Sequence, residues 1–170
     1  MSAQDREEDK TELLSEHTRA EIDSWVARFP KHGIRSASLQ ALLAAQHQNG
    51  GWVSVDLMDA VADYLGLPRI SVYEVATFYS MIETEPVGRH SVSICTNISC
   101  MLRGAEELVE HVEKRLGCRT GETTEDGRIF LKCEEECLAA CAGAPMMQVD
   151  HVYYTDLTPE KVDEILDKLE

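Results

Sequence analysis

The six cysteines of this 170-residue chain are confined to its second half, and this uneven distribution limits what that half can fold around. Residues 1–94 contain no cysteine at all. In a reducing compartment, clustered cysteines bind metal or carry out redox chemistry more often than they form structural disulfides. The second half is therefore predicted to hold a metal or redox centre. The cysteines are Cys95, Cys100, Cys118, Cys133, Cys137 and Cys141.

The chain is acidic, with 31 Asp and Glu against 16 Lys and Arg and a formal net charge of −15. Binding to nucleic acid or to an anionic membrane surface needs clustered basic residues, so we expect neither partner. No apolar run approaches the roughly 20 residues of a membrane-spanning helix, and the first twelve residues lack the apolar core of a signal peptide. We expect a cytoplasmic protein with no direct membrane insertion.

Hydrophobic periodicity predicts a helical first part. Four amphipathic segments with short connections indicate a compact helical bundle, a domain over residues 17–85. Before it, residues 1–16 are charged and are expected to be a flexible acidic tail. Aromatic side chains of the fourth helix are interpreted as core residues. The helices are expected over 18–29, 38–48 and 56–65, the third capped by Ser54, with a fourth from a capping box at 71–74 through residue 82.

The pattern changes after residue 85, where alternating apolar residues indicate strands. The predicted order is β-α-β-β-β-α with a small mixed sheet, which makes residues 86–170 an α/β domain. The fold class of the whole chain is therefore predicted to be α+β. Strands are expected over 90–95, 128–132, 146–149 and 152–154, and helices over 103–116 and 158–169.

Two cysteine pairs stand at the ends of these elements. Cys95-x₄-Cys100 covers the end of a strand and the loop before a helix, and Cys137-x₃-Cys141 lies in a loop before a later strand. We expect the four thiolates to converge at one edge of the sheet. A thioredoxin-type dithiol requires Cys-x-x-Cys, which is absent. The spacing favours a two-iron cluster, one pair for each iron, and leaves a zinc site open as the alternative.

Longer stretches of the sequence carry a family resemblance. From residue 18 to the end, the chain resembles the thioredoxin-like 2Fe-2S ferredoxin family, and within it the E subunits of NADH:quinone oxidoreductase (respiratory complex I). The matching segments are Gly51-Trp52-Val53, the run 75–80 (VATFYS), the run 86–90 (PVGRH), the run 121–124 (GETT), Asp126-Gly127, Cys95-x₄-Cys100 and the run from Cys137-x₃-Cys141 through Pro145-Met146-Met147.

The resemblance implies a fold, a cofactor and a partner. It implies a helical bundle followed by a thioredoxin-like domain, with one 2Fe-2S cluster ligated by Cys95, Cys100, Cys137 and Cys141. The function implied is electron transfer within a membrane-bound complex, from a peripheral position on its cytoplasmic side. The cluster would exchange single electrons with the flavin of a partner subunit. FMN and NADH would bind to that subunit and not to this chain, so no turnover is expected from the isolated chain.

Other functions remain open at this stage. An NAD-linked hydrogenase or formate dehydrogenase has an equivalent subunit with the same cysteine pattern. A free-standing shuttle ferredoxin and a zinc-stabilised interaction module are more distant alternatives. Metal analysis separates zinc from iron, and the copurifying subunits separate the complexes.

Several residues near the pairs carry further expectations. The family commonly has Gly where Ala139 stands, so Ala139 is expected to restrict its loop. Cys118 is interpreted as a buried apolar residue. A Cys133-x₃-Cys137 pair would have the same spacing as Cys137-x₃-Cys141, but the family resemblance favours Cys137 with Cys141, so Cys133 is interpreted as a non-ligand. Residues 134–136 are three glutamates directly before Cys137, and their charge is expected to lower the reduction potential of a nearby cluster, so their change to Gln should raise it. The aromatic fourth helix is expected to form part of the partner-binding surface.

Overall fold

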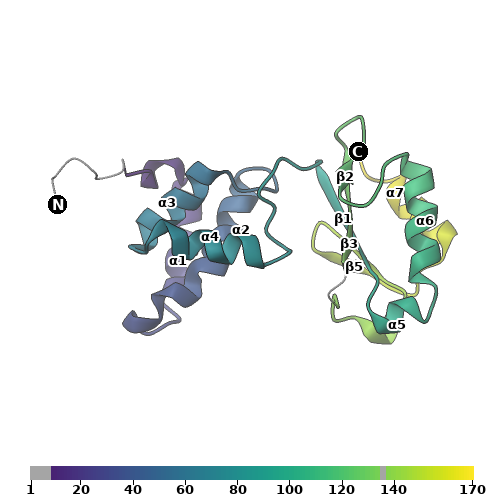
Figure 1. Ribbon diagram of the computed structural model, residues 1–170, viewed down its shortest axis with the longest axis horizontal. Coiled ribbons are helices and arrows are strands. Elements are labelled where there is room, and N and C mark those ends of the chain that lie inside the picture. The colour runs from purple at the N-terminus through teal and green to yellow at the C-terminus, as the bar shows by residue number, and fades with distance from the viewer. Residues whose placement is uncertain (1–8, 135–136) are drawn as a thin grey trace. The chain divides into compact units, whose positions relative to one another are not determined.

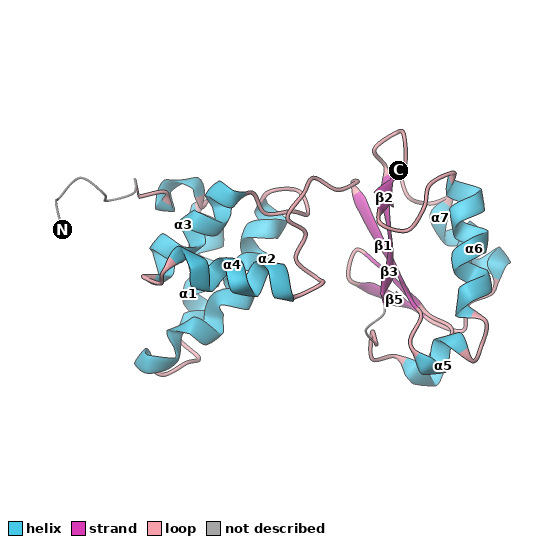
Figure 2. Cartoon of the chain, in the orientation of Figure 1, coloured by secondary structure: helices cyan, strands magenta, loops and turns pink. Residues whose placement is uncertain are grey.

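The computed structural model describes residues 9–134 and 137–170, with the side chains of Cys133 and Glu134 left out of the description. The chain divides into two compact units, the first up to Pro86 and the second from Val87 onward. The regular elements of the first unit, as far as it is described, are all helices, and the second unit is built on a sheet (Figures 1 and 2). Each unit has its own hydrophobic core.

The predicted four-helix bundle is confirmed. Ser54 accepts a hydrogen bond from the backbone N–H of Leu57 and caps α3 as predicted, because its side chain satisfies one of the free N–H groups of the first turn. Gly66 ends α3 in the left-handed conformation, at φ +66°. The helices are α1 (Glu16–Val26), α2 (Ser38–Gln48), α3 (Val55–Leu65) and α4 (Arg69–Phe78), with 3₁₀ turns η1 (Thr11–Leu13) and η2 (Lys31–Ala37).

The fourth helix differs from the prediction at both ends. It begins at Arg69 directly after Pro68, so Ser71 and Glu74 lie inside the helix and the predicted capping box is wrong. It ends at Phe78, whose side chain is 77% exposed, so the interpretation of this aromatic residue as core is also wrong. Prolines are favourable at helix starts because they have no N–H to satisfy, which moves the start upstream of Ser71.

The N-terminal segment is also more ordered than expected. Lys10 Nζ lies 2.7 Å from Asp56 Oδ1 and 2.6 Å from Asp59 Oδ2, and the side chain of Leu14 is fully buried in the first core. The expected flexible tail is therefore wrong from Lys10 onward, and residues 1–8 lie outside the described residues.

The second unit contains a five-stranded mixed sheet with the order β2-β3-β1-β4-β5. β1 runs parallel to β3 and antiparallel to β4, which confirms the predicted mixed sheet and the α+β fold class. The strands are β1 (His90–Cys95), β2 (Glu122–Thr123), β3 (Ile129–Glu134), β4 (Met147–Val149) and β5 (Val152–Tyr154), and the helices are α5 (Ile98–Met101), α6 (Ala105–Leu116) and α7 (Pro159–Leu166), with a 3₁₀ turn η3 (Cys141–Gly143).

Helices α6 and α7 pack on one face of this sheet (Figure 1). Val92 and Ile94 of β1 meet Leu108 of α6 and Leu166 of α7 in the second core, as the alternation in the sequence predicts. The short helix α5 was not predicted, because four residues are too few to show a helical period. In the part of the chain that the structure describes, none of the helices has the length and hydrophobicity that crossing a bilayer requires.

Candidate metal centre

The first cysteine pair is mounted on regular secondary structure and is buried. Cys95 is the last residue of β1 and Cys100 lies in α5, with exposed fractions of 2% and 1%. The backbone N–H of Cys95 donates to Met146 O at 3.2 Å, and that of Cys100 donates to Asn97 O at 2.8 Å. The end of a strand and the following helix therefore fix both sulfur atoms from two directions.

The second pair lies in the loop that leads to β4 and is exposed to solvent. The Sγ atoms of Cys137 and Cys141 are 3.1 Å apart. Cys141 begins the turn η3, and the backbone N–H of Ala139 donates to Cys137 Sγ at 3.3 Å. An N–H group directed at a sulfur stabilises the thiolate form that binds metal.

The backbone of this loop has two special features, and the sequence analysis anticipated only the first of them, as a restriction at Ala139. Ala139 adopts φ +63°, in the left-handed region that costs a residue with a Cβ about 1–2 kcal/mol relative to the right-handed helix. Gly143 faces Thr155 so closely that an added Cβ would lie 2.5 Å from Thr155 Cβ. The glycine that family members commonly carry at the position of Ala139 is the only hint in the sequence of the first feature.

The loop that carries the second pair packs against the buried first pair. Cys95 and Cys100 belong to a buried group with Met146, against which Leu138 and Ala140 of the second loop pack. No three His, Cys, Asp or Glu side chains within the described ranges form a site for one metal ion. Each pair is formed within its own segment, since Cys100 hydrogen bonds with Cys95 and the Sγ atoms of Cys137 and Cys141 lie 3.1 Å apart.

The buried pair has a perturbed titration. Burial raises the pKa of the Cys100 thiol to about 11, with a further contribution from its hydrogen bond with Cys95. The negative charge of Cys141 acts in the same direction, so this residue of the second pair lies within electrostatic range of the first. Metal binding at such thiols must therefore release protons, because the thiolate is the ligand.

Charged groups approach the centre from its edge. Arg103 follows α5 and donates to Ala144 O at 3.2 Å, which ties the second loop to the end of the helix that carries Cys100. Its guanidinium brings a positive charge beside the loop. Of the three glutamates before Cys137, residues 135–136 and the side chain of Glu134 lie outside the described residues, so their effect on a reduction potential stays a prediction.

Cys118, His90 and His111 have ordinary environments. Cys118 is half-buried against the second core, and this burial raises the pKa of its thiol. His90 hydrogen bonds to Asp150 at 2.6 Å, and His111 to Asp163 at 2.9 Å, so both have polar partners away from the cysteine pairs. The side chain of Cys133 lies outside the described residues, and its exclusion from the ligand set stays a prediction.

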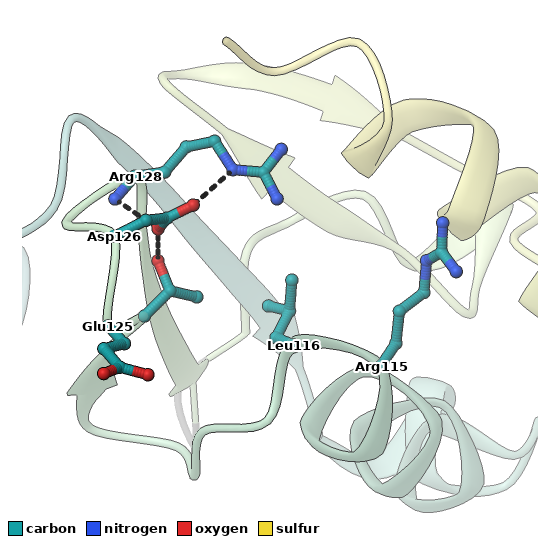
Figure 3. A pocket seen from close by; sticks show the side chains of 6 residues that line it. Arg115, Leu116, Glu125, Asp126 and Arg128 are labelled. Carbon is teal, nitrogen blue, oxygen red and sulfur yellow. Dashed lines mark hydrogen bonds and ion pairs between the residues drawn. The ribbon is translucent and has the colours of Figure 1, made fainter.

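A separate pocket of about 380 Å³ in the second unit contains no cysteine (Figure 3). Its two arginines are already paired, Arg115 with Asp163 at 3.0 Å and Arg128 with Asp126 at 3.4 Å. Thr124 Oγ1 also donates to Asp126 at 2.6 Å. The charges of the pocket therefore compensate one another, and the cysteine pairs are the better functional candidate. The pocket is lined by Arg115, Leu116, Thr124, Glu125, Asp126 and Arg128.

The donor set fits a 2Fe-2S cluster. Four thiols in two adjacent pairs supply the ligands that such a cluster takes, and the 3.1 Å separation of the second pair allows both sulfurs to reach one iron. The buried side is apolar and the open side carries an N–H donor to sulfur. Both properties are suited to a partly shielded cluster of this kind.

Comparison with known proteins finds a matching family and several similar proteins. Residues 22–170 match the family described as "Thioredoxin-like [2Fe-2S] ferredoxin". The E subunit of the NADH-quinone oxidoreductase of Rickettsia conorii is 46% identical over 145 residues, which cover 85% of this chain and 86% of that protein. The "NADH dehydrogenase [ubiquinone] flavoprotein 2, mitochondrial" of Dictyostelium discoideum is 39% identical over 168 residues, which cover 94% of this chain and 68% of that protein.

Among solved structures, an NAD+-reducing [NiFe]-hydrogenase in the air-oxidised state matches with a TM-score of 0.64 at 22% identity. The match covers 75% of this chain, whereas this chain spans only 22% of that hydrogenase chain. At this identity the similarity shows the fold alone.

Proposed function

The chain belongs to the thioredoxin-like 2Fe-2S ferredoxin family, and we propose that it is the electron-transfer subunit of an NADH:quinone oxidoreductase. Its ligands are Cys95, Cys100, Cys137 and Cys141, and it exchanges single electrons with the flavin of an NADH-oxidising partner subunit. The observation that carries this proposal is the packing of the loop with the second thiol pair against the buried first pair, in a chain 46% identical to an NADH-quinone oxidoreductase E subunit.

A 2Fe-2S cluster, when bound, accepts and returns one electron. The chain's own residues hold it and set its surroundings. Cys95 and Cys100 provide the buried side, where Met146 excludes water. Ala139 donates an N–H to the sulfur of Cys137, and Arg103 adds a positive charge at the loop. Both favour the additional negative charge of a reduced state.

The partner supplies the two-electron chemistry. We assign FMN and NADH to a flavin- and NADH-binding subunit of the same complex, because hydride transfer belongs to those cofactors. The names of the relatives support a multi-subunit NADH dehydrogenase. We further propose that the chain is peripheral, on the cytoplasmic side of a membrane-bound complex. The fold similarity to a hydrogenase carries no preference for that activity, so the quinone-linked function is retained.

The proposal is tested by anaerobic purification of the full chain. We expect a brown protein with iron and acid-labile sulfide in roughly equal amounts, about two of each per chain, and an EPR signal that appears on reduction. A colourless protein that contains zinc would sink the proposal. Identification of the subunits that copurify with the chain then separates a quinone-linked complex from a hydrogenase or formate dehydrogenase.

A further inference from the structure

The two sulfur atoms of the exposed cysteine pair are close enough to react with each other. Cys137 and Cys141 are both exposed, and their Sγ atoms lie 3.1 Å apart. Reacting atoms in a near-attack geometry are separated by about 3–3.5 Å. A movement of about 1 Å would bring the two sulfurs to the ~2.05 Å of a disulfide bond. Oxidation of this pair to a disulfide therefore needs only a small shift of the loop.

The loop can make this shift while its anchor stays in place. Residues 137–140 form neither helix nor strand, so their backbone can move without breaking the sheet. The loop is held to the buried pair by Leu138 and Ala140, which pack against it. The exposed residues Cys137 and Cys141 are not part of that contact. The residues that would react are thus different from the residues that anchor the loop.

The buried pair offers no such access. Cys95 and Cys100 also hydrogen bond with each other, but their exposed fractions are 2% and 1%. Thiol–disulfide exchange requires an incoming disulfide to reach one of the sulfurs directly. Cys95 ends β1 and Cys100 lies in α5, so regular secondary structure holds both residues inside. An oxidant from solvent therefore reaches the second pair and not the first.

We infer that the exposed pair is a site of reversible oxidation, at which a small disulfide such as glutathione disulfide forms a Cys137–Cys141 disulfide in the chain before its cluster is loaded. One thiolate of the pair attacks glutathione disulfide, which gives a mixed disulfide and releases one glutathione. The other thiolate attacks the protein sulfur of that mixed disulfide and releases the second glutathione. The pair loses two electrons and two protons, and glutathione disulfide gains them.

The consequence of this oxidation rests on the proposed function, because it concerns the loading of the cluster. Metal binds to the thiolate, so a sulfur in a disulfide is lost as a ligand. The oxidised chain keeps only half of its proposed ligands and takes up no cluster until a thiol reduces the pair again. Exposed disulfides are the ones that thiols reduce most readily. The exposed pair therefore restricts cluster loading to reducing conditions.

The test uses the full chain, stripped of metal with a chelator and then equilibrated with glutathione disulfide without oxygen. Alkylation and peptide mass spectrometry show which of the six cysteines have lost their thiol. We expect a disulfide between Cys137 and Cys141 alone, and we expect excess glutathione to restore both thiols. Reconstitution with iron and sulfide should be at least about 10-fold slower for the oxidised chain, and dithiothreitol should restore the rate of the reduced chain.

Two variants make the assignment specific. Cys141→Ser removes the sulfur that completes the reaction, so oxidation should stop at a glutathione adduct on Cys137. The matched control is Cys118→Ala, which removes a half-buried thiol outside the pair. It should form the same disulfide as the wild type and reconstitute at the same rates before and after reduction.

The outcomes separate this inference from the proposed function. Retention of every thiol, or a disulfide that contains Cys95, Cys100 or Cys133, would overturn the oxidation site. An oxidised chain that takes up its cluster as fast as the reduced chain would overturn the restriction on loading. A reduced chain that stays colourless after reconstitution would refute the proposed function, whereas the mapped disulfide would still decide whether the exposed pair is oxidised.

Discussion

The two units of this chain bury their polar groups in opposite environments. The first unit surrounds one carboxylate with charge, since Asp59 is 3% exposed and contacts Lys10 at 2.6 Å, Arg69 at 3.2 Å and the hydroxyl of Tyr73. The second unit holds its thiols among apolar and uncharged residues. We therefore expect the stability of the first unit to depend on the protonation state of Asp59. The stability of the second unit should depend instead on the metal centre that its thiols bind.

The largest expected effect comes from removing a ligand in the second unit. Cys95→Ala and Cys141→Ala should both abolish the visible spectrum, while the helical unit stays folded. An added thiol should be able to replace the missing ligand in only one of the two variants, because Cys141 is exposed and Cys95 is 2% exposed. An external thiol such as β-mercaptoethanol should restore a spectrum in Cys141→Ala and not in Cys95→Ala, as absorption titrations would show.

Control variants keep this test specific. Cys118→Ala and Cys133→Ala should leave the spectrum unchanged, since neither is in the proposed ligand set. Loss of the spectrum in Cys133→Ala would show that Cys137 pairs with Cys133 rather than with Cys141. Rescue of Cys95→Ala by external thiol would contradict the buried position of the first pair.

The second effect breaks the charged centre of the first unit. Asp59→Asn leaves Lys10 and Arg69 with one partner fewer, and we expect the free energy of unfolding of that unit to fall by about 2–4 kcal/mol. Urea denaturation followed by the fluorescence of Trp25 and Trp52, both in the first unit, measures it. The cluster spectrum should not change, and a spectral loss at low urea would show that the two units are not independent.

The same centre predicts a pH dependence. Burial alone would raise the pKa of Asp59, but hydrogen bonds from Lys10 and Tyr73 and the charge of Arg69 hold it below its usual range. Its contribution is therefore present above pH of about 4 and is lost as the pH falls through the lowered value. The hydrogen bond to Asp59 raises the pKa of Tyr73 to about 12, so its contribution is present below pH of about 10 and is lost toward 12. Asp59→Asn should therefore make the free energy of unfolding less dependent on pH in both the acid and the alkaline range.

A smaller effect is expected in the loop of the exposed pair. Gly143→Ala places a Cβ 2.5 Å from Thr155 Cβ, so the loop must shift and stability should fall by about 1–3 kcal/mol. The cluster should then be lost faster to a chelator, because Cys141 lies two residues away. Gly143→Ala/Thr155→Gly restores the space and should restore retention. A double variant as labile as the single one would show that Thr155 is not the obstacle.

The sequence predicted features that depend on interactions between residues near each other in the chain, and it missed those that depend on distant residues. Periodic segments located the helices and strands, and the cap at Ser54 was predictable because it is local. The contact between Lys10 and Asp59 joins residues far apart in the chain, so no local pattern announces it, and the N-terminal segment was wrongly taken as a tail. Phe78 has a large apolar side chain of the kind usually found in a core, and only the three-dimensional packing shows that it faces solvent.

The candidate site also has a part that the sequence predicted and a part that only the structure shows. Cysteine spacing and the family resemblance predicted the pairs, and in the structure Leu138 and Ala140, from the loop of the second pair, pack against the buried first pair. The sequence could not show which pair is buried, since both segments are equally apolar. That difference depends on which elements carry the residues, a strand end and a helix for Cys95 and Cys100, and a loop for Cys137 and Cys141.

The smallest expected effect concerns the backbone at Ala139. Glycine adopts the φ of +63° with less strain than alanine. The strain energy that Ala139→Gly relieves exceeds the free-energy cost of the extra unfolded-state entropy by about 0.5–1 kcal/mol. Ala139→Gly should thus slow cluster loss to a chelator by about 2–5-fold, because the N–H donor to Cys137 is held with less strain. The matched control is Ala142→Gly, at an exposed residue of the same loop that is not among those with positive φ. It should make the loop slightly less stable, because glycine gains nothing there. If both glycines slow the loss equally, general loop flexibility accounts for the effect and the left-handed conformation does not.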